Sequence, residues 1–110
     1  MRQGEIWFAD LNPAKGSEQS GNRPVVIVSG NTLNDALPIV IVVPVTSKVK
    51  SYPTCVVLPA NRTSGLKKDS EAIPFQIRAI AKKRLTKRIG RIRSEELREI
   101  LKGLFVALTH

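Results

Sequence analysis

The pattern of apolar and polar positions predicts several short strands followed by one helix. Apolar, β-branched runs bounded by Gly, Pro, Asn or Asp indicate strands, which we place at residues 5–10, 24–29, 38–45, 54–58, 72–79 and 88–92. The run at 38–45 is almost continuously apolar, as in a strand buried on both faces. Residues 30–35 are turn-rich and interrupt the pattern, and residues 81–85 are predicted to form one helical turn. Pro74 cannot donate a ladder hydrogen bond, so the strand at 72–79 is expected to bend there.

A helix is predicted after Arg93. Ser94 is a suitable N-cap, and the two glutamates that follow it place negative charge in the first helical turn. One apolar stripe at helical spacing comes next, formed by Leu97, Ile100, Leu101, Leu104, Phe105 and Leu108. We expect this stripe to cover a sheet or barrel. Short strands closed by turns, with a terminal helix, predict an α+β fold built on a small barrel.

Size and composition limit the possible classes of protein. A chain of 110 residues corresponds to one domain, 1–110, that buries a core without disulfides or metal. The longest apolar run, 39–45, has the length of a strand and not of a membrane span, and no secretory signal is recognisable, so a cytoplasmic protein is expected. Cys55 is the single cysteine, which excludes an internal disulfide and a cysteine cluster for zinc; we expect a buried strand thiol.

The net charge of +9 is unevenly distributed. Residues 1–55 contain five Lys/Arg and four Asp/Glu, whereas residues 56–110 contain thirteen and five. Between Arg78 and Arg93 there are eight basic residues and no acidic one. Such a field attracts polyanions such as nucleic acid, and it attracts an acidic protein partner equally well.

A polar loop at residues 15–24 leads into the second predicted strand. It combines a carboxylate, Glu18, with two amides and Arg23, and Pro24 favours an extended conformation for that arginine. This mixture of groups suits a site that binds and cleaves a phosphodiester. An ordinary hairpin loop with solvated charges fits the same spacing.

Several motifs in a fixed order resemble the MazF/PemK family of toxin endoribonucleases. They are GEIWFADLNP at 4–13, GSEQ at 16–19, GNRP at 21–24, VPVTS at 43–47, DS at 69–70, FQIR at 75–78 and KRL at 83–85. The resemblance spans nearly the whole chain, and the combination is much more specific than any one motif. Phe75 is a departure, because the family usually has an acidic residue before Gln76; this bears on substrate recognition, not on the family.

The resemblance implies an SH3-like barrel, usually a homodimer, that acts as the toxin of a type II toxin–antitoxin system. It implies sequence-selective cleavage of single-stranded RNA without a metal or other cofactor, in which a ribose 2′-hydroxyl attacks phosphorus to leave a 2′,3′-cyclic phosphate and a 5′-hydroxyl. The implied partners are the RNA substrate and an acidic, MazE-like antitoxin, and no membrane is involved.

The catalytic residues implied by the resemblance are Arg23 and Thr46, with Glu18 as a third candidate. The guanidinium of Arg23 suits the charge of the phosphorane because it makes two charge-assisted hydrogen bonds, and Thr46 adds a hydroxyl donor. The general base stays open. Arginine holds its proton tightly, the Glu18 carboxylate is a weak base that can instead orient Arg23, and His110 is a terminal residue expected to fray.

Further side chains are predicted to contact RNA. They are Ser17, Gln19, Asn22, Ser47, Lys48, Tyr52, Gln76 and Arg78. Gln76 and Arg78 match family positions near the substrate groove. Tyr52, beside lysines, can stack on a base, or it can pack within a Tyr-Pro turn.

Two other functions are compatible with the chain. A toxin on the same barrel can act on a protein target, as the related DNA gyrase inhibitors do, although the loop from Glu18 to Arg23 argues against this. A non-catalytic nucleic-acid binder would explain the basic stretch alone. RNA cleavage separates both from a ribonuclease.

Overall fold

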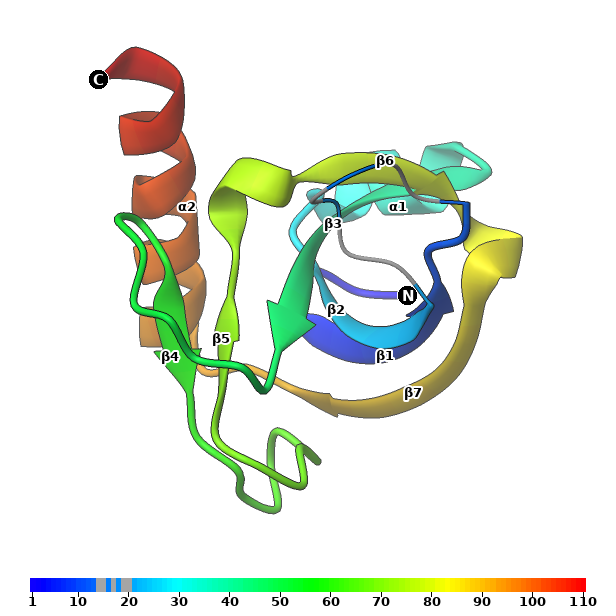
Figure 1. Ribbon diagram of the computed structural model, residues 1–110. Helices are drawn as coiled ribbons and strands as arrows, with labels where there is room; N and C mark the ends of the chain where they lie inside the picture. Colours follow the sequence, from blue (N-terminus) through cyan, green and yellow to red (C-terminus); the bar gives the residue numbers. More distant parts are fainter. Residues whose placement is uncertain (14–15, 17, 19–20) are drawn as a thin grey trace.

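The computed structural model describes residues 1–13, 16, 18 and 21–110 (Figure 1). Its strands are β1 (Glu5–Asp10), β2 (Asn22–Ile27), β3 (Ile39–Thr46), β4 (Val56–Leu58), β5 (Ser70–Ala72), β6 (Arg78–Ala81) and β7 (Leu85–Arg91). Its helices are α1 (Asn31–Ala36), α2 (Ser94–Thr109) and the 3-10 turns η1 (Pro74–Gln76) and η2 (Lys82–Arg84). None of the helices in the described part of the chain has the length and hydropathy needed to cross a bilayer.

The strands form one antiparallel sheet in the order β4-β5-β3-β2-β1-β7, and β6 pairs with β3. Figure 1 shows the sheet curled, with β6 continuing through η2 into β7 so that the chain closes around β1 and β2. This is the small barrel with a C-terminal helix that the sequence predicts. The strand β3 is shared: Val25 of β2 pairs with Pro44, but Val45 and Thr46 pair with β5.

The side chains of the curled sheet alternate between two cores, since successive residues of a strand point to opposite faces. The barrel core lies inside the curl and contains Ala9, Leu11, Val25, Ile27, Val40, Val42, Ile80 and Leu85. The helix-side core lies between the sheet and α2 and contains Ile6, Val26, Val28, Val43, Val45, Leu58, Leu66, Ala72, Ile92 and Ile100. A strand buried on both faces was expected at 38–45, and β3 supplies both cores.

The loop at residues 61–69 packs backbone to backbone against β7. The Arg91 N–H donates to the Thr63 carbonyl at 2.9 Å. A Cβ atom on Gly90 would lie 2.2 Å from the Ser64 carbonyl oxygen, and one on Gly65, whose φ is +69°, would lie 1.9 Å from the Ile89 carbonyl oxygen. Only glycine permits this approach at either position. The loop is therefore held at a fixed place on the sheet.

Two predicted local structures are wrong. Most of the turn-rich segment 30–35 lies in the helix α1, which buried Asn34 ties to the chain just after β2. The Asn34 amide donates to the Ser29 carbonyl at 2.9 Å, and the Ser29 hydroxyl donates to Asn34 Oδ1 at 2.5 Å. The strand predicted at 72–79 is interrupted by η1, since Pro74 favours the first position of a helical turn. The helical turn expected at 81–85 is confirmed as η2.

The helix α2 is confirmed, but its N-cap is Arg93 and not Ser94. The Arg93 N–H donates to Glu96 Oε1 at 2.8 Å, so a carboxylate of the first helical turn satisfies the N–H of the N-cap residue. The predicted stripe covers the sheet only in part. Ile100 is fully buried, whereas Leu101, Phe105 and Leu108 are 40%, 64% and 79% exposed. The stripe is wider than the surface that β4 and η1 offer to it.

Glu5 connects β1 to β7. Burial raises the pKa of Glu5, but hydrogen bonds from the Arg2 N–H, the Trp7 indole and the Arg88 guanidinium outweigh this and lower the pKa below its ordinary value of 4.5. A lowered pKa stabilises the fold above 4.5, and this stabilisation is lost as the pH falls through the pKa of the folded state.

We therefore expect Glu5→Gln to reduce stability at pH 7 and to match the wild type well below pH 4.5. Denaturant unfolding at the two pH values measures the difference. Glu99→Gln, at an exposed position on α2, serves as the control. Equal losses at both pH values would show that Glu5 acts by packing and not by its charge.

Candidate active site

Arg23 and Thr46 lie at the ends of adjacent strands. The last pair of the β2–β3 ladder is Val25 with Pro44, and each of the two residues lies two positions beyond it. This is also the point where β3 leaves β2 and pairs with β5. The register therefore places the two predicted catalytic residues at corresponding positions just beyond the last pair of the β2–β3 ladder.

The same side of the sheet carries Arg23, Thr46 and Arg78. Arg23 precedes Val25 by two residues and Arg78 precedes Ile80 by two, and both of these apolar residues belong to the barrel core. Thr46 follows Val45, which faces the other core, so Thr46 faces the barrel side. Arg78 is fixed by donating from Nη1 to the Leu11 carbonyl at 3.4 Å. The guanidinium groups of Arg23 and Arg78 and the hydroxyl of Thr46 thus lie on the barrel side of the sheet.

Thr46 is buried, with 7% of its surface exposed, and its hydroxyl has a defined partner. The Lys48 N–H donates to Thr46 Oγ1 at 3.1 Å. Because Thr46 Oγ1 accepts this hydrogen bond, its O–H stays able to donate a hydrogen bond to a phosphate oxygen. Rigid placement at the end of a strand suits such a donor.

Glu71 holds the loop that follows Thr46. It pairs with Thr46 across β3 and β5, is 2% exposed, and accepts hydrogen bonds from the Lys50 N–H at 3.0 Å and the Ser51 N–H at 3.2 Å. Glu71 was not among the functional residues predicted from the sequence. A carboxylate immediately before the apolar Ala72 and Ile73 was the available signal, since a charge there needs a buried partner.

We expect Glu71→Gln to lower the free energy of unfolding by about 1–3 kcal/mol. The amide keeps one acceptor oxygen, but its NH₂ faces one of the two loop N–H groups and leaves it unsatisfied. Denaturant unfolding measures the loss, with Glu99→Gln on the exposed face of α2 as the control. A variant as stable as the control would contradict the role of Glu71 in holding the loop.

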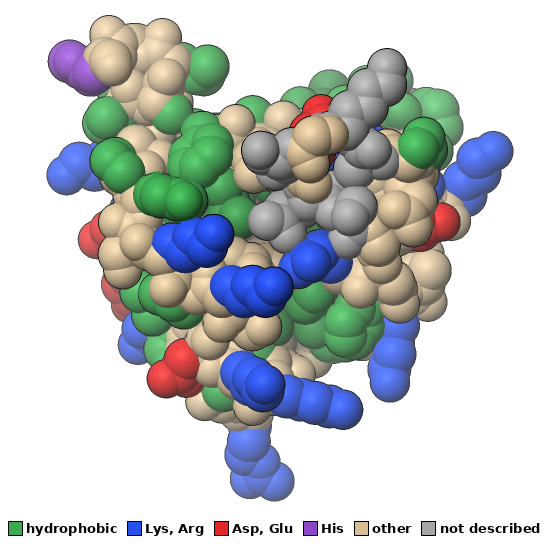
Figure 2. Space-filling view, in the orientation of Figure 1, with side chains coloured by type: hydrophobic (Ala, Val, Ile, Leu, Met, Phe, Trp, Pro, Cys, Tyr) green, Lys and Arg blue, Asp and Glu red, His purple; other side chains and the backbone are tan. Residues whose placement is uncertain are grey.

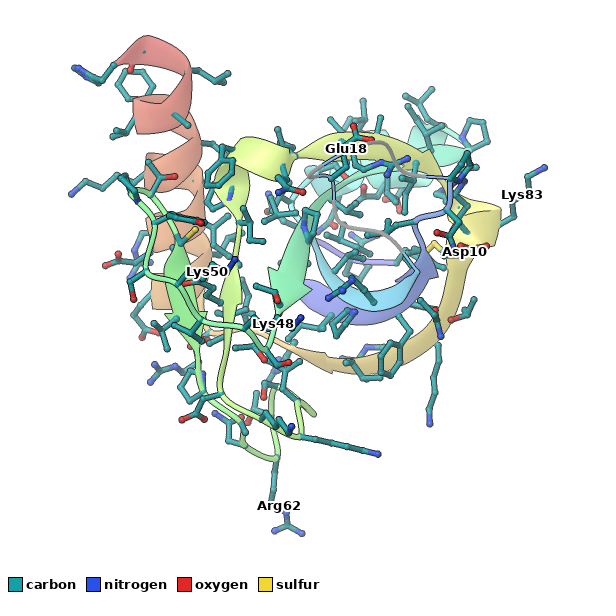
Figure 3. The ribbon with its side chains drawn as sticks, viewed as in Figure 1. Asp10, Glu18, Lys48, Lys50, Arg62 and Lys83 are labelled. Carbon is teal, nitrogen blue, oxygen red and sulfur yellow. The ribbon has the colours of Figure 1, made fainter. Side chains whose placement is uncertain are left out.

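The predicted functional residues of the first loop and of the loop after β3 lie at different places in the structure, and two of them fall outside the described residues. Glu18 is exposed and in Figure 3 lies at the upper edge of the curled sheet, whereas Lys48 lies beside the end of β3. Asn22 begins β2 and is exposed. Ser17 and Gln19 fall outside the described residues. The roles predicted for these residues remain predictions.

Tyr52 and Phe75 form an exposed aromatic pair. Their ring centroids are 6.4 Å apart at an interplanar angle of 60°, and Lys50 Nζ lies 6.0 Å from the Tyr52 centroid. Gln76 follows Phe75 in η1, so the departure from the family pattern at Phe75 adds an aromatic surface beside Gln76. Tyr52 and Phe75 line a hollow of about 500 Å³ at the end of α2, and His110 lines it with them.

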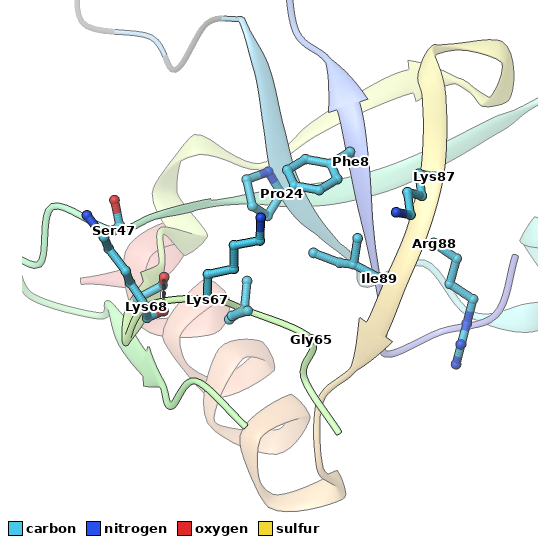
Figure 4. A pocket seen from close by; sticks show the side chains of 11 residues that line it. Phe8, Pro24, Ser47, Gly65, Lys67, Lys68, Lys87, Arg88 and Ile89 are labelled. Carbon is cyan, nitrogen blue, oxygen red and sulfur yellow. Dashed lines mark hydrogen bonds between the residues drawn. The ribbon is translucent and has the colours of Figure 1, made fainter. Parts of the chain in front are cut away.

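A second hollow, which we call the basic pocket, opens between the loop at 61–69 and the strands β1 and β7 (Figure 4). Its volume is about 530 Å³. It is lined by Phe8, Pro24, Ser47, Gly65, Leu66, Lys67, Lys68, Ser70, Lys87, Arg88 and Ile89. Of these, Ser47 was predicted to contact RNA, and Lys87 and Arg88 belong to the basic stretch at 78–93, whereas no role was predicted for Lys67 and Lys68. The convergence of these side chains depends on the fold.

Lysine and arginine side chains gather across the middle and lower part of the face seen in Figure 2, while acidic side chains occur mostly toward its margins. The described residues contain no group of three or more His, Cys, Asp or Glu side chains arranged to hold a metal ion. Cys55 is half-buried just before β4, not inside a strand as expected. Burial, followed by the negative charge of Glu71, raises the pKa of its thiol.

Comparison with known proteins identifies the class to which this fold and site belong. The family model described as PemK-like, MazF-like toxin of type II toxin–antitoxin systems matches residues 2–108. Endoribonuclease MazF9 of Mycobacterium tuberculosis is 44% identical, over 94% of this chain and 92% of the relative. The chain therefore belongs to the MazF/PemK family of toxins, as the ordered motifs predicted.

Solved structures share the fold. MazF from Deinococcus radiodurans superposes with a TM-score of 0.87 at 24% identity, over 100% of this chain and 97% of that chain. A chain of the MazE–MazF structure (Form-II) from the same organism gives a TM-score of 0.79 at 26% identity, over 98% and 95% of the two chains. The barrel with a C-terminal helix is thus the fold of MazF structures.

Proposed function

We propose that this protein is the endoribonuclease toxin of a type II toxin–antitoxin system and that it cleaves single-stranded RNA. The observation that carries the proposal is the placement of Arg23 and Thr46 at the ends of adjacent strands, on one face, in a chain of the MazF/PemK family. The relative MazF9 is itself named an endoribonuclease. We take residues 1–110 as a single toxin domain.

The proposed reaction is attack of a ribose 2′-hydroxyl on the adjacent phosphorus, which breaks the bond to the 5′ oxygen and leaves a 2′,3′-cyclic phosphate; the departing 5′ oxygen takes a proton from solvent and becomes a 5′-hydroxyl. Arg23 donates two charge-assisted hydrogen bonds to the phosphorane oxygens, whose charge grows in the transition state. The Thr46 hydroxyl donates a hydrogen bond to the same oxygens. Glu18 either accepts the 2′-hydroxyl proton or orients Arg23.

The proposed partners follow from charge and family. A net charge of +9 favours RNA and an acidic antitoxin, and a solved relative is a MazE–MazF complex. We further propose that the toxin is a homodimer and works in the cytoplasm. The exposed residues Leu101, Phe105 and Leu108 of α2 give an apolar surface that a second copy can cover.

The test is incubation of the purified protein with a long single-stranded RNA in the presence of EDTA. Discrete fragments with 5′-hydroxyl ends are expected, and their ends map the recognition sequence. Fragments that appear only when magnesium replaces EDTA would contradict the metal-independent reaction. Intact RNA from a folded protein would contradict the ribonuclease and favour a toxin that acts on a protein target.

A further inference from the structure

The basic pocket concentrates positive charge in a concave space. Lys67 and Lys68 come from the loop at 61–69 and Lys87 comes from β7, and none of the lining residues is acidic. In Figure 4 the ammonium groups of Lys67 and Lys87 point toward the space in front of Phe8 and Pro24, while Arg88 points away. Charges from distant parts of the sequence therefore converge on one site.

These lysines are not used to stabilise the described part of the fold. Arg88 pairs with Glu5 at 2.9 Å, but none of the ion pairs found among the described residues includes Lys67, Lys68 or Lys87. Lys67 and Lys87 face the same space with no acidic side chain among its lining, so their positive field favours a bound anion there. The loop that carries Lys67 and Lys68 cannot easily move away, because Gly65 and Gly90 fix it against β7. The pocket is thus preorganised for an anion.

The remaining lining is apolar and includes one aromatic ring. Phe8, Pro24 and Ile89 are half-buried and lie across the pocket from the loop lysines. A simple phosphate ion would use the lysines but not this surface. A nucleotide uses both, because its phosphates pair with lysines while its base contacts the ring and the neighbouring apolar side chains.

The pocket adjoins the catalytic residues through the backbone. Pro24 and Ser47 line it, and each directly follows a predicted catalytic residue, Arg23 or Thr46. Since successive residues of a strand point to opposite faces, the catalytic pair and the pocket lie on the two sides of the same strand ends. A single strand that bends over this edge reaches both.

We propose that the basic pocket holds a nucleotide of the RNA that flanks the cleaved bond. This inference rests on the proposed function, because it makes the pocket a second contact for the same substrate. The phosphates on either side of the bound nucleotide pair with Lys67 and Lys87, and the base lies against Phe8.

The test is binding of a fluorescein-labelled, mixed-sequence single strand with 2′-O-methyl groups, which lacks the attacking hydroxyl. We expect Lys67→Gln with Lys87→Gln to raise Kd about tenfold and to reduce the slope of log K against log salt by about 1.4, since each lost phosphate contact contributes about 0.7. The matched control is Arg98→Gln with Lys102→Gln, two exposed cations of α2 that lie outside the pocket and outside the basic stretch at 78–93, with Kd within about twofold of the wild type. Phe8→Leu keeps an apolar side chain but removes the ring, and we expect it to weaken binding at constant salt slope.

The outcomes separate the pocket from the ribonuclease. Equal RNA affinities and equal salt slopes in the pocket and control variants would overturn the proposal. If the pocket variant then lost binding to poly-glutamate, the pocket would be assigned to an acidic protein. Cleavage of unmodified RNA by the same wild-type preparation tests the ribonuclease independently. Weaker binding by the pocket variant, with no cleavage by the wild type, would keep the pocket as a nucleic-acid site and remove the ribonuclease.

Discussion

Arg23→Ala is expected to reduce the rate of RNA cleavage by about 10²–10³-fold without loss of the fold. Arg23 lies on the same face as Thr46, and its guanidinium can offer two parallel hydrogen bonds to a phosphorane, whereas Arg78 on that face already donates from Nη1 to the Leu11 carbonyl. Alanine removes both donors at the step where negative charge develops. The measurement is single-turnover cleavage of an RNA that carries one mapped site.

Two further variants define what Arg23 supplies. Arg23→Lys keeps the charge but not the planar pair of donors, so we expect only partial recovery of the rate. Arg98→Ala removes an exposed arginine from α2 and is expected to cleave at the wild-type rate. An Arg23→Ala protein that is folded, binds RNA and cleaves it normally would show that another group stabilises the transition state.

Gly90→Ala is expected to lower the free energy of unfolding by about 3 kcal/mol or more. A Cβ atom there would lie 2.2 Å from the Ser64 carbonyl oxygen and 2.4 Å from that of Thr63. Both are backbone atoms, and the Arg91 N–H bonds to the Thr63 carbonyl, so neither can move without breaking this contact. Denaturant unfolding measures the loss, and a weakened contact between β7 and the loop at 61–69 is expected to weaken RNA binding as well.

Gly30→Ala is the matched control, because a Cβ atom at Gly30 meets nothing within 4 Å and its φ is −65°. We expect its stability to stay within about 0.5 kcal/mol of the wild type. If Gly90→Ala were equally stable, the close packing of the loop on β7 would not contribute to the fold.

Strands with strong apolar patterns were predictable from the sequence, and segments that depend on tertiary partners were not. The first strand has the predicted bounds, 5–10, and β3 lies within one residue of its prediction. The helix α1 depends on a buried Asn34 that bonds to Ser29, and no local pattern indicates that contact. Turn-forming residues make equally good caps and buried hydrogen-bond partners.

The candidate site also has residues that were predictable from the sequence and residues that were not. Arg23 and Thr46 were identified by motifs, and strand register then places them on one face. Glu71 and the basic pocket were missed because their significance lies in pairing between β3 and β5 and in the approach of a distant loop to β7. Charge counts alone indicated a basic surface, and only the fold shows where it becomes concave.

The alternation of side chains at the ends of β2 and β3 has a consequence for how such toxins diversify. Residues 23 and 46 face one side of the sheet, while residues 24 and 47 face the other together with the loop at 61–69. On the roles proposed above, changes in the loop, or at 24 and 47, alter which RNA is selected while the proposed catalytic pair, Arg23 and Thr46, keeps its surroundings. Substitutions on the face that carries residues 24 and 47 would then change the RNA target, while the proposed chemistry at residues 23 and 46 on the other face stays the same.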